Sequence, residues 1–199
     1  MNNKKFPCYN CKTENKLGAL FCKNCNSIQP ATETNYFRIL NLDPNFEINL
    51  KTLEDNYLNL QTSLHPDQFK QKSDIEQSLA LKHSSILNEA YDIIKSNRKR
   101  SEYLLKLQNI IVNQDNKTSI QPDPELLHEI FEIRDQIDET SDTESLNKLN
   151  SNIENSINSI TSQLAKLFKK QDFEIAAKLT IKLRYFEKIS EELSLKTSS

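Results

Sequence analysis

The 199-residue chain contains a single glycine and no tryptophan. Glycine-rich phosphate loops and dinucleotide-binding motifs need several glycines, because their backbone adopts positive φ or approaches the ligand closely. One glycine therefore argues against a nucleotide-binding enzyme. The chain also lacks any run that approaches the ~20 apolar residues of a membrane-spanning helix, so we expect no membrane partner.

An excess of charge of one sign is missing as well. The 26 Lys and Arg residues nearly balance the 28 Asp and Glu residues, which leaves a formal net charge of -2. A chain of this kind has no overall electrostatic attraction to nucleic acid or to anionic lipid. Protein partners are therefore expected, and nucleic-acid binding is not.

All four cysteines lie near the N-terminus, where they form two CxxC pairs: Cys8 with Cys11, and Cys22 with Cys25. Two such turns can direct four thiolates into one tetrahedron, and four sulfur ligands are typical of a closed structural zinc site. We therefore predict that residues 1–30 fold around one zinc ion. Two disulfides, four free thiols and an iron–sulfur cluster remain alternatives, although the lack of a secretory signal disfavours disulfides.

A helical hairpin is expected after Pro30. A short helix over residues 35–40 precedes a longer one over residues 49–63, and a third helix covers residues 75–96. Pro66 ends the second helix, because its ring excludes helical backbone at His65 and it has no amide hydrogen. His65-Pro66-Asp67 therefore lies in the loop between two antiparallel helices. The apolar stripe of the second helix consists of Leu50, Leu53, Tyr57, Leu60 and Leu64.

A second helical region follows residues 109–122, which lack periodicity and are expected to form a linker. Asp123 is a good N-cap, and Pro124 suits the first helical position. Ser141 and Glu144 have capping-box spacing for the next helix, and Asp172 opens a third. These signals predict a three-helix bundle over residues 123–199. The fold class is therefore all-α: a helical hairpin within residues 31–108 and a C-terminal three-helix bundle, with a small zinc-binding segment in front.

Two apolar pairs do not fit the core stripes of this bundle: Leu127 with Phe131, and Ile181 with Tyr185. Each pair lies about 100° around its helix from the core stripe. They belong either to wide core faces or to an exposed patch that binds a partner. The pattern alone leaves both interpretations open.

Several segments resemble a J-domain: Tyr36-Phe37 in the short first helix, His65-Pro66-Asp67 between two helices, and Asn88-Glu89-Ala90-Tyr91 in the third. The run Ser101-Glu102-Tyr103-Leu104-Leu105-Lys106-Leu107 resembles the end of the J-domain in iron–sulfur cluster co-chaperones of the HscB type. That family also has a C-terminal helical domain. The two CxxC pairs and Leu20-Phe21-Cys22 resemble its eukaryotic branch, so the resemblance spans nearly the whole chain.

The resemblance implies a co-chaperone rather than an enzyme. In this family the loop tripeptide, here His65, Pro66 and Asp67, stimulates ATP hydrolysis by a DnaK-type chaperone. The C-terminal domain binds the iron–sulfur cluster scaffold protein, which is thereby delivered to the chaperone. The matching positions in this chain are Leu127, Phe131, Glu132, Asp135 and Tyr185. The family implies mitochondria, while the lack of a recognisable presequence leaves the cytoplasm open, and a homodimer stays open too.

Two other functions remain as alternatives: a general J-domain co-chaperone for unfolded clients, and a zinc-ribbon interaction module with a helical tail. A nucleic-acid-binding ribbon predicts basic stripes interleaved with aromatic residues, which the chain lacks after residue 30. An enzyme would need a nucleophile or an acid–base pair in a pocket. His65, His83 and His128 form no recognisable constellation of that kind with the carboxylates.

Overall fold

The computed structural model describes residues 5–112 and 120–197, and it is all-α as predicted. Within these residues lie seven α-helices, one short 3₁₀ helix and a single two-stranded sheet. Contacts divide the chain into two compact units. The first comprises Met1–Pro44 and Ile48–Ser96, and the second comprises Asn45–Glu47 and Asn97–Ser199. No helix in the described ranges is long and apolar enough to cross a membrane.

The N-terminal segment of the first unit has little regular structure. Strands β1 (Lys5–Pro7) and β2 (Glu14–Lys16) pair antiparallel, with Phe6 opposite Asn15. One isolated bridge joins Phe21 to Ile28, and Ile28 is fully buried. A two-stranded sheet is marginally stable by itself in water, so this segment needs another source of stability.

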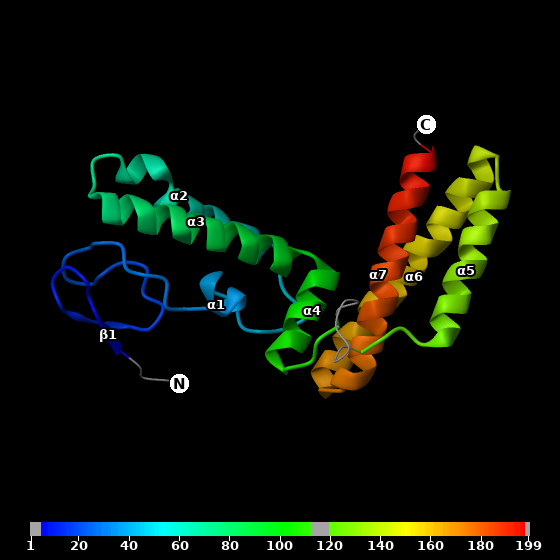
Figure 1. Cartoon of the computed structure of the whole chain (residues 1–199), viewed down its shortest axis with the longest axis horizontal. Helices are drawn as coiled ribbons and strands as arrows, with labels where there is room; N and C mark the ends of the chain where they lie inside the picture. The colour runs from blue at the N-terminus through cyan, green and yellow to red at the C-terminus, as the bar shows by residue number, and fades with distance from the viewer. Residues whose placement is uncertain (1–4, 113–119, 198–199) are drawn as a thin grey trace. The chain divides into compact units, whose positions relative to one another are not determined.

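The rest of the first unit forms the expected hairpin. After the short α1 (Tyr36–Ile39), α2 (Leu50–Leu64) and α3 (Asp74–Lys95) lie side by side, joined through the 3₁₀ turn η1 (Pro66–Phe69) (Figure 1). Ser73 and Glu76 form a capping box that starts α3. Leu53 and Leu64 are buried as predicted. Leu50, the first residue of α2, is 57% exposed, so the buried stripe begins only at Leu53.

The second unit contains the predicted three-helix bundle. Helices α5 (Pro124–Glu139) and α6 (Thr143–Lys170) both pack against α7 (Phe173–Thr197). Asp123 is the N-cap of α5, as predicted, and its side chain accepts a hydrogen bond from the Leu126 amide. The N-cap of α6 is Asp142 rather than Ser141, because the Asp142 side chain accepts from the Ser145 amide. A carboxylate at this position also interacts favourably with the helix dipole.

Helix α4 (Asn97–Leu107) belongs to the second unit by its contacts and packs against α7. Ser101 and Thr180, both fully buried, share a hydrogen bond between their hydroxyls. The Arg184 guanidinium donates to the Glu102 carboxylate at 2.8 Å. The domain borders expected at residues 30/31, 108/109 and 122/123 stay predictions, because contacts describe packing and not independent folding.

Candidate functional site

Each CxxC pair forms a tight turn of the same shape. The amide of Lys12 donates to the Cys8 carbonyl at 3.1 Å, and the amide of Asn26 donates to the Cys22 carbonyl at 3.0 Å. Lys12 and Asn26 both have positive φ, 62° and 54° respectively. A left-handed residue after each pair reverses the chain, and asparagine tolerates this conformation well.

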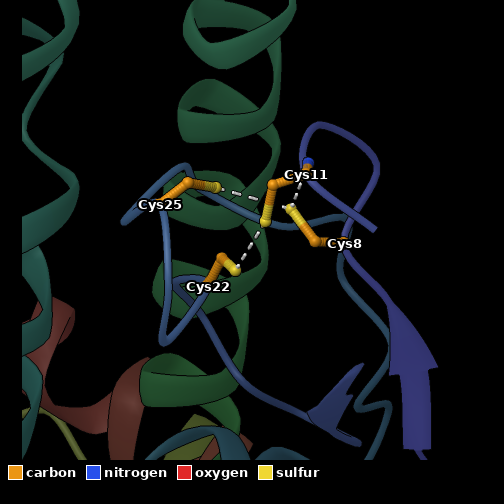
Figure 2. A group of neighbouring side chains, drawn as sticks. All are labelled: Cys8, Cys11, Cys22 and Cys25. Carbon is orange, nitrogen blue, oxygen red and sulfur yellow. Dashed lines mark hydrogen bonds between the residues drawn. The ribbon is translucent and has the colours of Figure 1, made fainter. Parts of the chain in front are cut away.

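The two turns bring all four sulfur atoms together, as the sequence predicted (Figure 2). The four Sγ atoms lie within 4.8 Å of one another. Cys8 Sγ is 3.7 Å from Cys25 Sγ, and Cys11 Sγ is 3.6 Å from Cys22 Sγ. Sulfurs at ~2.3 Å from a central zinc form a tetrahedron with edges of ~3.8 Å, so the cluster has the dimensions of a metal site. None of the four cysteines forms a disulfide, contrary to the disulfide alternative.

Hydrogen bonds favour the deprotonated sulfur at two of these cysteines. Hydrogen bonds with Thr13, and then with Asn24, lower the pKa of the Cys11 thiol to about 5. At Cys8 burial raises the pKa, but hydrogen bonds from the Cys11 amide and the Ser27 hydroxyl, among others, outweigh burial and lower the pKa to about 7. The thiolate is the form that binds metal ions. The cluster can therefore hold a metal ion.

A buried glutamine lies directly beside the cluster. Gln29 is fully buried, and its Nε2 donates to Cys8 Sγ at 3.3 Å. The backbone carbonyl of Gln29 accepts a hydrogen bond from Nε2 of His83, on α3, at 2.7 Å. Burial lowers the pKa of His83 and so favours the neutral imidazole, and Nε2 carries the hydrogen because a carbonyl oxygen can only accept. Sequence reasoning missed this pair, because no local pattern marks a contact across 54 residues.

The tripeptide His65-Pro66-Asp67 lies at the end of the α2–α3 hairpin. His65 is the C-cap of α2, and Pro66 is the first residue of η1. The Asp67 amide donates to His65 Nδ1 at 3.3 Å, and the Asp67 carboxylate lies 2.9 Å from Lys70 Nζ. The side chains of His65 and Asp67 are 57% and 61% exposed. Both are therefore accessible to a partner.

Two buried side chains hold this turn in place. Leu64 precedes the tripeptide and Phe69 closes the turn, and both are almost completely buried. The Ser84 hydroxyl of α3 donates to the Leu64 carbonyl at 3.3 Å. Pro66 fixes one backbone angle in addition. The imidazole and the carboxylate are thus presented on a backbone that loses little conformational entropy when a partner binds.

The residues that the resemblance assigns to scaffold binding on α5 lie on its exposed face. Leu127 and Phe131, one helical turn apart, are 46% and 63% exposed, whereas Ile130 is buried. Glu132 and Asp135 are exposed as well. Helix α5 therefore carries an apolar pair next to two carboxylates, in line with the interpretation as a patch.

The α7 side of this region differs in part from expectation. Ile181 is 2% exposed and belongs to the core, which agrees with the interpretation as a wide core face. Helix α7 packs against α4, α5 and α6, which widens its buried face beyond one stripe. Tyr185 is half-buried. Lys182 Nζ donates to both carboxylate oxygens of Glu129, at 2.7 and 2.8 Å, and so joins this part of α7 to α5.

The three histidines have different surroundings. His65 and His128 each lie near a carboxylate of their own segment, at 3.8 and 3.4 Å, whereas His83 contacts a backbone carbonyl.

Several known proteins are similar to this chain. The family model described as the HSCB C-terminal oligomerisation domain matches residues 122–194. The iron–sulfur cluster co-chaperone protein HscB of Mus musculus is 32% identical over 192 residues, which cover 94% of this chain and 81% of that protein. The Homo sapiens protein of the same name is 30% identical over 193 residues, which cover 95% and 81%. The crystal structure of human co-chaperone protein HscB matches with a TM-score of 0.87 and 30% identity, and covers 96% of this chain and 98% of that one.

Proposed function

We propose that this chain, which belongs to the HscB family of iron–sulfur cluster co-chaperones, binds a cluster scaffold protein and delivers it to a DnaK-type chaperone whose ATPase it stimulates. The observation that carries the proposal is the exposed His65-Pro66-Asp67 at the turn of the α2–α3 hairpin. A delivery protein has to hold two partners at once. The tripeptide and the apolar pair of α5 lie in different compact units, which suits that task.

The loop has the chemistry to engage a cationic surface on the chaperone. An exposed carboxylate such as that of Asp67 can accept charge-assisted hydrogen bonds from a partner's arginine. In the free protein this carboxylate pairs with Lys70 at 2.9 Å, with both side chains exposed. Exposed pairs of this kind are weak, so a partner can replace Lys70 at little cost.

Scaffold binding is assigned to one surface formed by α5 and α7. An exposed leucine and phenylalanine one helical turn apart form a continuous apolar surface, and such surfaces commonly mark interaction sites. The ion pair between Glu129 and Lys182 joins α5 to α7. The scaffold-binding patch is thus proposed to consist of Leu127, Phe131, Glu132, Asp135 and Tyr185.

We assign one structural zinc ion to Cys8, Cys11, Cys22 and Cys25, as in the eukaryotic type of the family. With four thiolate ligands no position is open to water, so the ion would stabilise the segment and take no part in chemistry. Mitochondria are the proposed compartment, because the resemblance to the family implies it. Sedimentation of the purified protein tests whether the chain forms a homodimer.

Stimulation of a DnaK-type chaperone's ATPase, measured with and without scaffold protein, tests the function. Asp67→Asn should abolish stimulation and leave scaffold affinity unchanged, because the tripeptide and the patch lie in different units. Gln68→Ala, in the same turn, is the matched control and should stimulate normally. Stimulation by Asp67→Asn at the wild-type level would reject the proposal. Stimulation by unfolded clients but not by scaffold would favour the general co-chaperone instead.

A further inference from the structure

We propose that Gln29 is a positioning residue that couples the metal site to helix α3, so that a bound ion stabilises the hairpin that presents His65-Pro66-Asp67. The inference rests on the zinc ion proposed above. It goes further by naming the residues through which the ion would act on the rest of the first unit.

The side chain of Gln29 is oriented toward the cluster. Its Nε2 lies 3.3 Å from Cys8 Sγ, 2.8 Å from the Ser27 carbonyl and 3.0 Å from the Ser27 hydroxyl. A carbonyl oxygen can only accept, so the Ser27 carbonyl fixes which end of the amide faces this way. An N–H donor to sulfur stabilises the thiolate that a metal ion needs, as outer hydrogen bonds do in metal sites.

This orientation leaves the oxygen of the Gln29 side chain without a hydrogen bond in the described part of the chain. Gln29 Oε1 is buried and has no hydrogen-bond partner among the described residues. A buried polar atom without a partner is destabilising, so a glutamine that only filled space here would be a poor choice. The hydrogen bond that the Gln29 amide donates to Cys8 gives a reason for a glutamine at this position.

The main chain of the same residue is fixed to other elements. The Gln29 amide donates to the Leu20 carbonyl at 2.9 Å, and its carbonyl accepts from His83 Nε2 at 2.7 Å. Gln29 therefore touches the cluster through its side chain and α3 through its backbone. If the segment loosened without metal, the partly buried imidazole of His83 would lose its acceptor, which is unfavourable.

A second hydrogen bond connects α3 to the base of the loop that contains His65-Pro66-Asp67. Ser84 follows His83, and its hydroxyl donates to the carbonyl of Leu64, the residue before the tripeptide. Two adjacent residues of one helix thus hold the metal-binding segment and the base of the loop. Loss of the ion would weaken the first contact and leave this part of α3 less well fixed.

Thermodynamic linkage means that the coupling can be tested by a substitution on α3, with zinc affinity as the measurement. If the ion stabilises the Gln29–His83 contact, the contact must strengthen ion binding by the same factor. A substitution at His83, which lies on α3 and outside the cysteine set, should therefore weaken zinc binding.

Zinc affinity, measured by competition with a chromophoric chelator, provides the first test. His83→Phe keeps a ring and removes the donor, and it should weaken zinc binding ~5-fold or more. His83→Gln can still donate and should restore most of the affinity. Gln29→Met should weaken binding ~10-fold or more. His128→Phe, on α5, is the matched control and should bind as the wild type does.

The outcomes separate this coupling from the proposals on which it rests. A wild-type chain without zinc would overturn the zinc site, and the coupling with it. Wild-type affinity in His83→Phe would overturn the coupling and leave the zinc site intact. A His83→Gln variant as weak as His83→Phe would show that packing, not the hydrogen bond, matters, and would overturn the positioning role.

Hydrogen exchange on the unsubstituted protein gives a second test that needs no variant to fold. Removal of zinc by a chelator should speed amide exchange in α3 around residues 80–87 and leave the exchange of α6 and α7 unchanged. If exchange around residues 80–87 is the same with and without zinc, the coupling is overturned.

Discussion

Glu129 on α5 and Lys182 on α7 form an ion pair in which Lys182 Nζ lies 2.7 Å from one carboxylate oxygen. Both side chains are partly exposed, so the pair stabilises the bundle little, but it aligns the two helices. Residues two apart on a helix point in nearly opposite directions, so Leu127 and Phe131 face away from the Glu129 side chain and remain exposed. The ion pair therefore fixes how α5 is turned against α7, while the apolar pair of the proposed patch lies on another face of α5.

Phe131→Ala is expected to weaken scaffold binding by ~2 kcal/mol or more, about 30-fold, because large exposed apolar residues commonly anchor interfaces. The same change should alter the free energy of unfolding by ~0.5 kcal/mol or less, since the ring is 63% exposed. Ile130→Ala, at the buried neighbouring residue, serves as the comparison and should lower the free energy of unfolding by ~2–5 kcal/mol. Calorimetric titration with scaffold and thermal melting measure the two effects. A Phe131→Ala variant that melts as early as Ile130→Ala would place the ring in the core and reject the patch.

The loop should respond differently to changes at its surface and at its buried base. Asp67→Asn should stop chaperone stimulation without lowering stability. Phe69→Ala should destabilise the first unit by ~3–5 kcal/mol, because a buried ring leaves a cavity, and should also reduce stimulation by loosening the turn. ATPase assays and denaturant unfolding report the two properties. Full stimulation by a destabilised Phe69→Ala would show that the loop does not need its buried anchor.

Local signals in the sequence located most of the helices. Pro66 marked the end of α2, and Asp123 with Pro124 marked the start of α5, because prolines and caps act within one turn of backbone. The CxxC spacing likewise predicted that four sulfurs would meet, since each turn involves only a few residues. The choice between Ser141 and Asp142 as N-cap was missed, because two neighbouring residues both suit that position.

Features that depend on long-range packing were not predictable in the same way. Ile181 is buried because three helices surround α7, and no single helical stripe contains that information. Arg100 is 4% exposed and donates to the Phe46 carbonyl at 2.8 Å, although arginines are mostly exposed. The contact of Gln29 with His83 has the same character, since it joins segments that are distant in sequence.

Zinc binding should depend on the cysteines and much less on the exposed groups around them. Purified protein should contain about one zinc ion per chain, and Cys11→Ser should lose it, because a closed site needs all four ligands. Asn24→Ala removes only an exposed donor 3.7 Å from Cys11 Sγ and should retain the metal. Elemental analysis measures both. A metal-free wild-type protein whose N-terminal segment resists proteolysis would contradict the prediction.

The stability of the first unit should fall as the pH is lowered, through His83. Burial lowers the pKa of His83 below the usual value near ~6.5, so the unfolded chain takes up a proton at a higher pH than the folded one does. The unfolded state then binds more protons, and the free energy of unfolding decreases as the pH falls below ~6.5, by at most ~1.4 kcal/mol per pH unit. Urea unfolding of the wild type and of His83→Gln between ~pH 7.5 and ~pH 5.5 isolates this contribution, because other titrating groups, the cysteines included, are common to both proteins. The wild type should lose stability relative to His83→Gln toward low pH. A difference in stability that stays constant over this range would mean that His83 titrates alike in the folded and unfolded states.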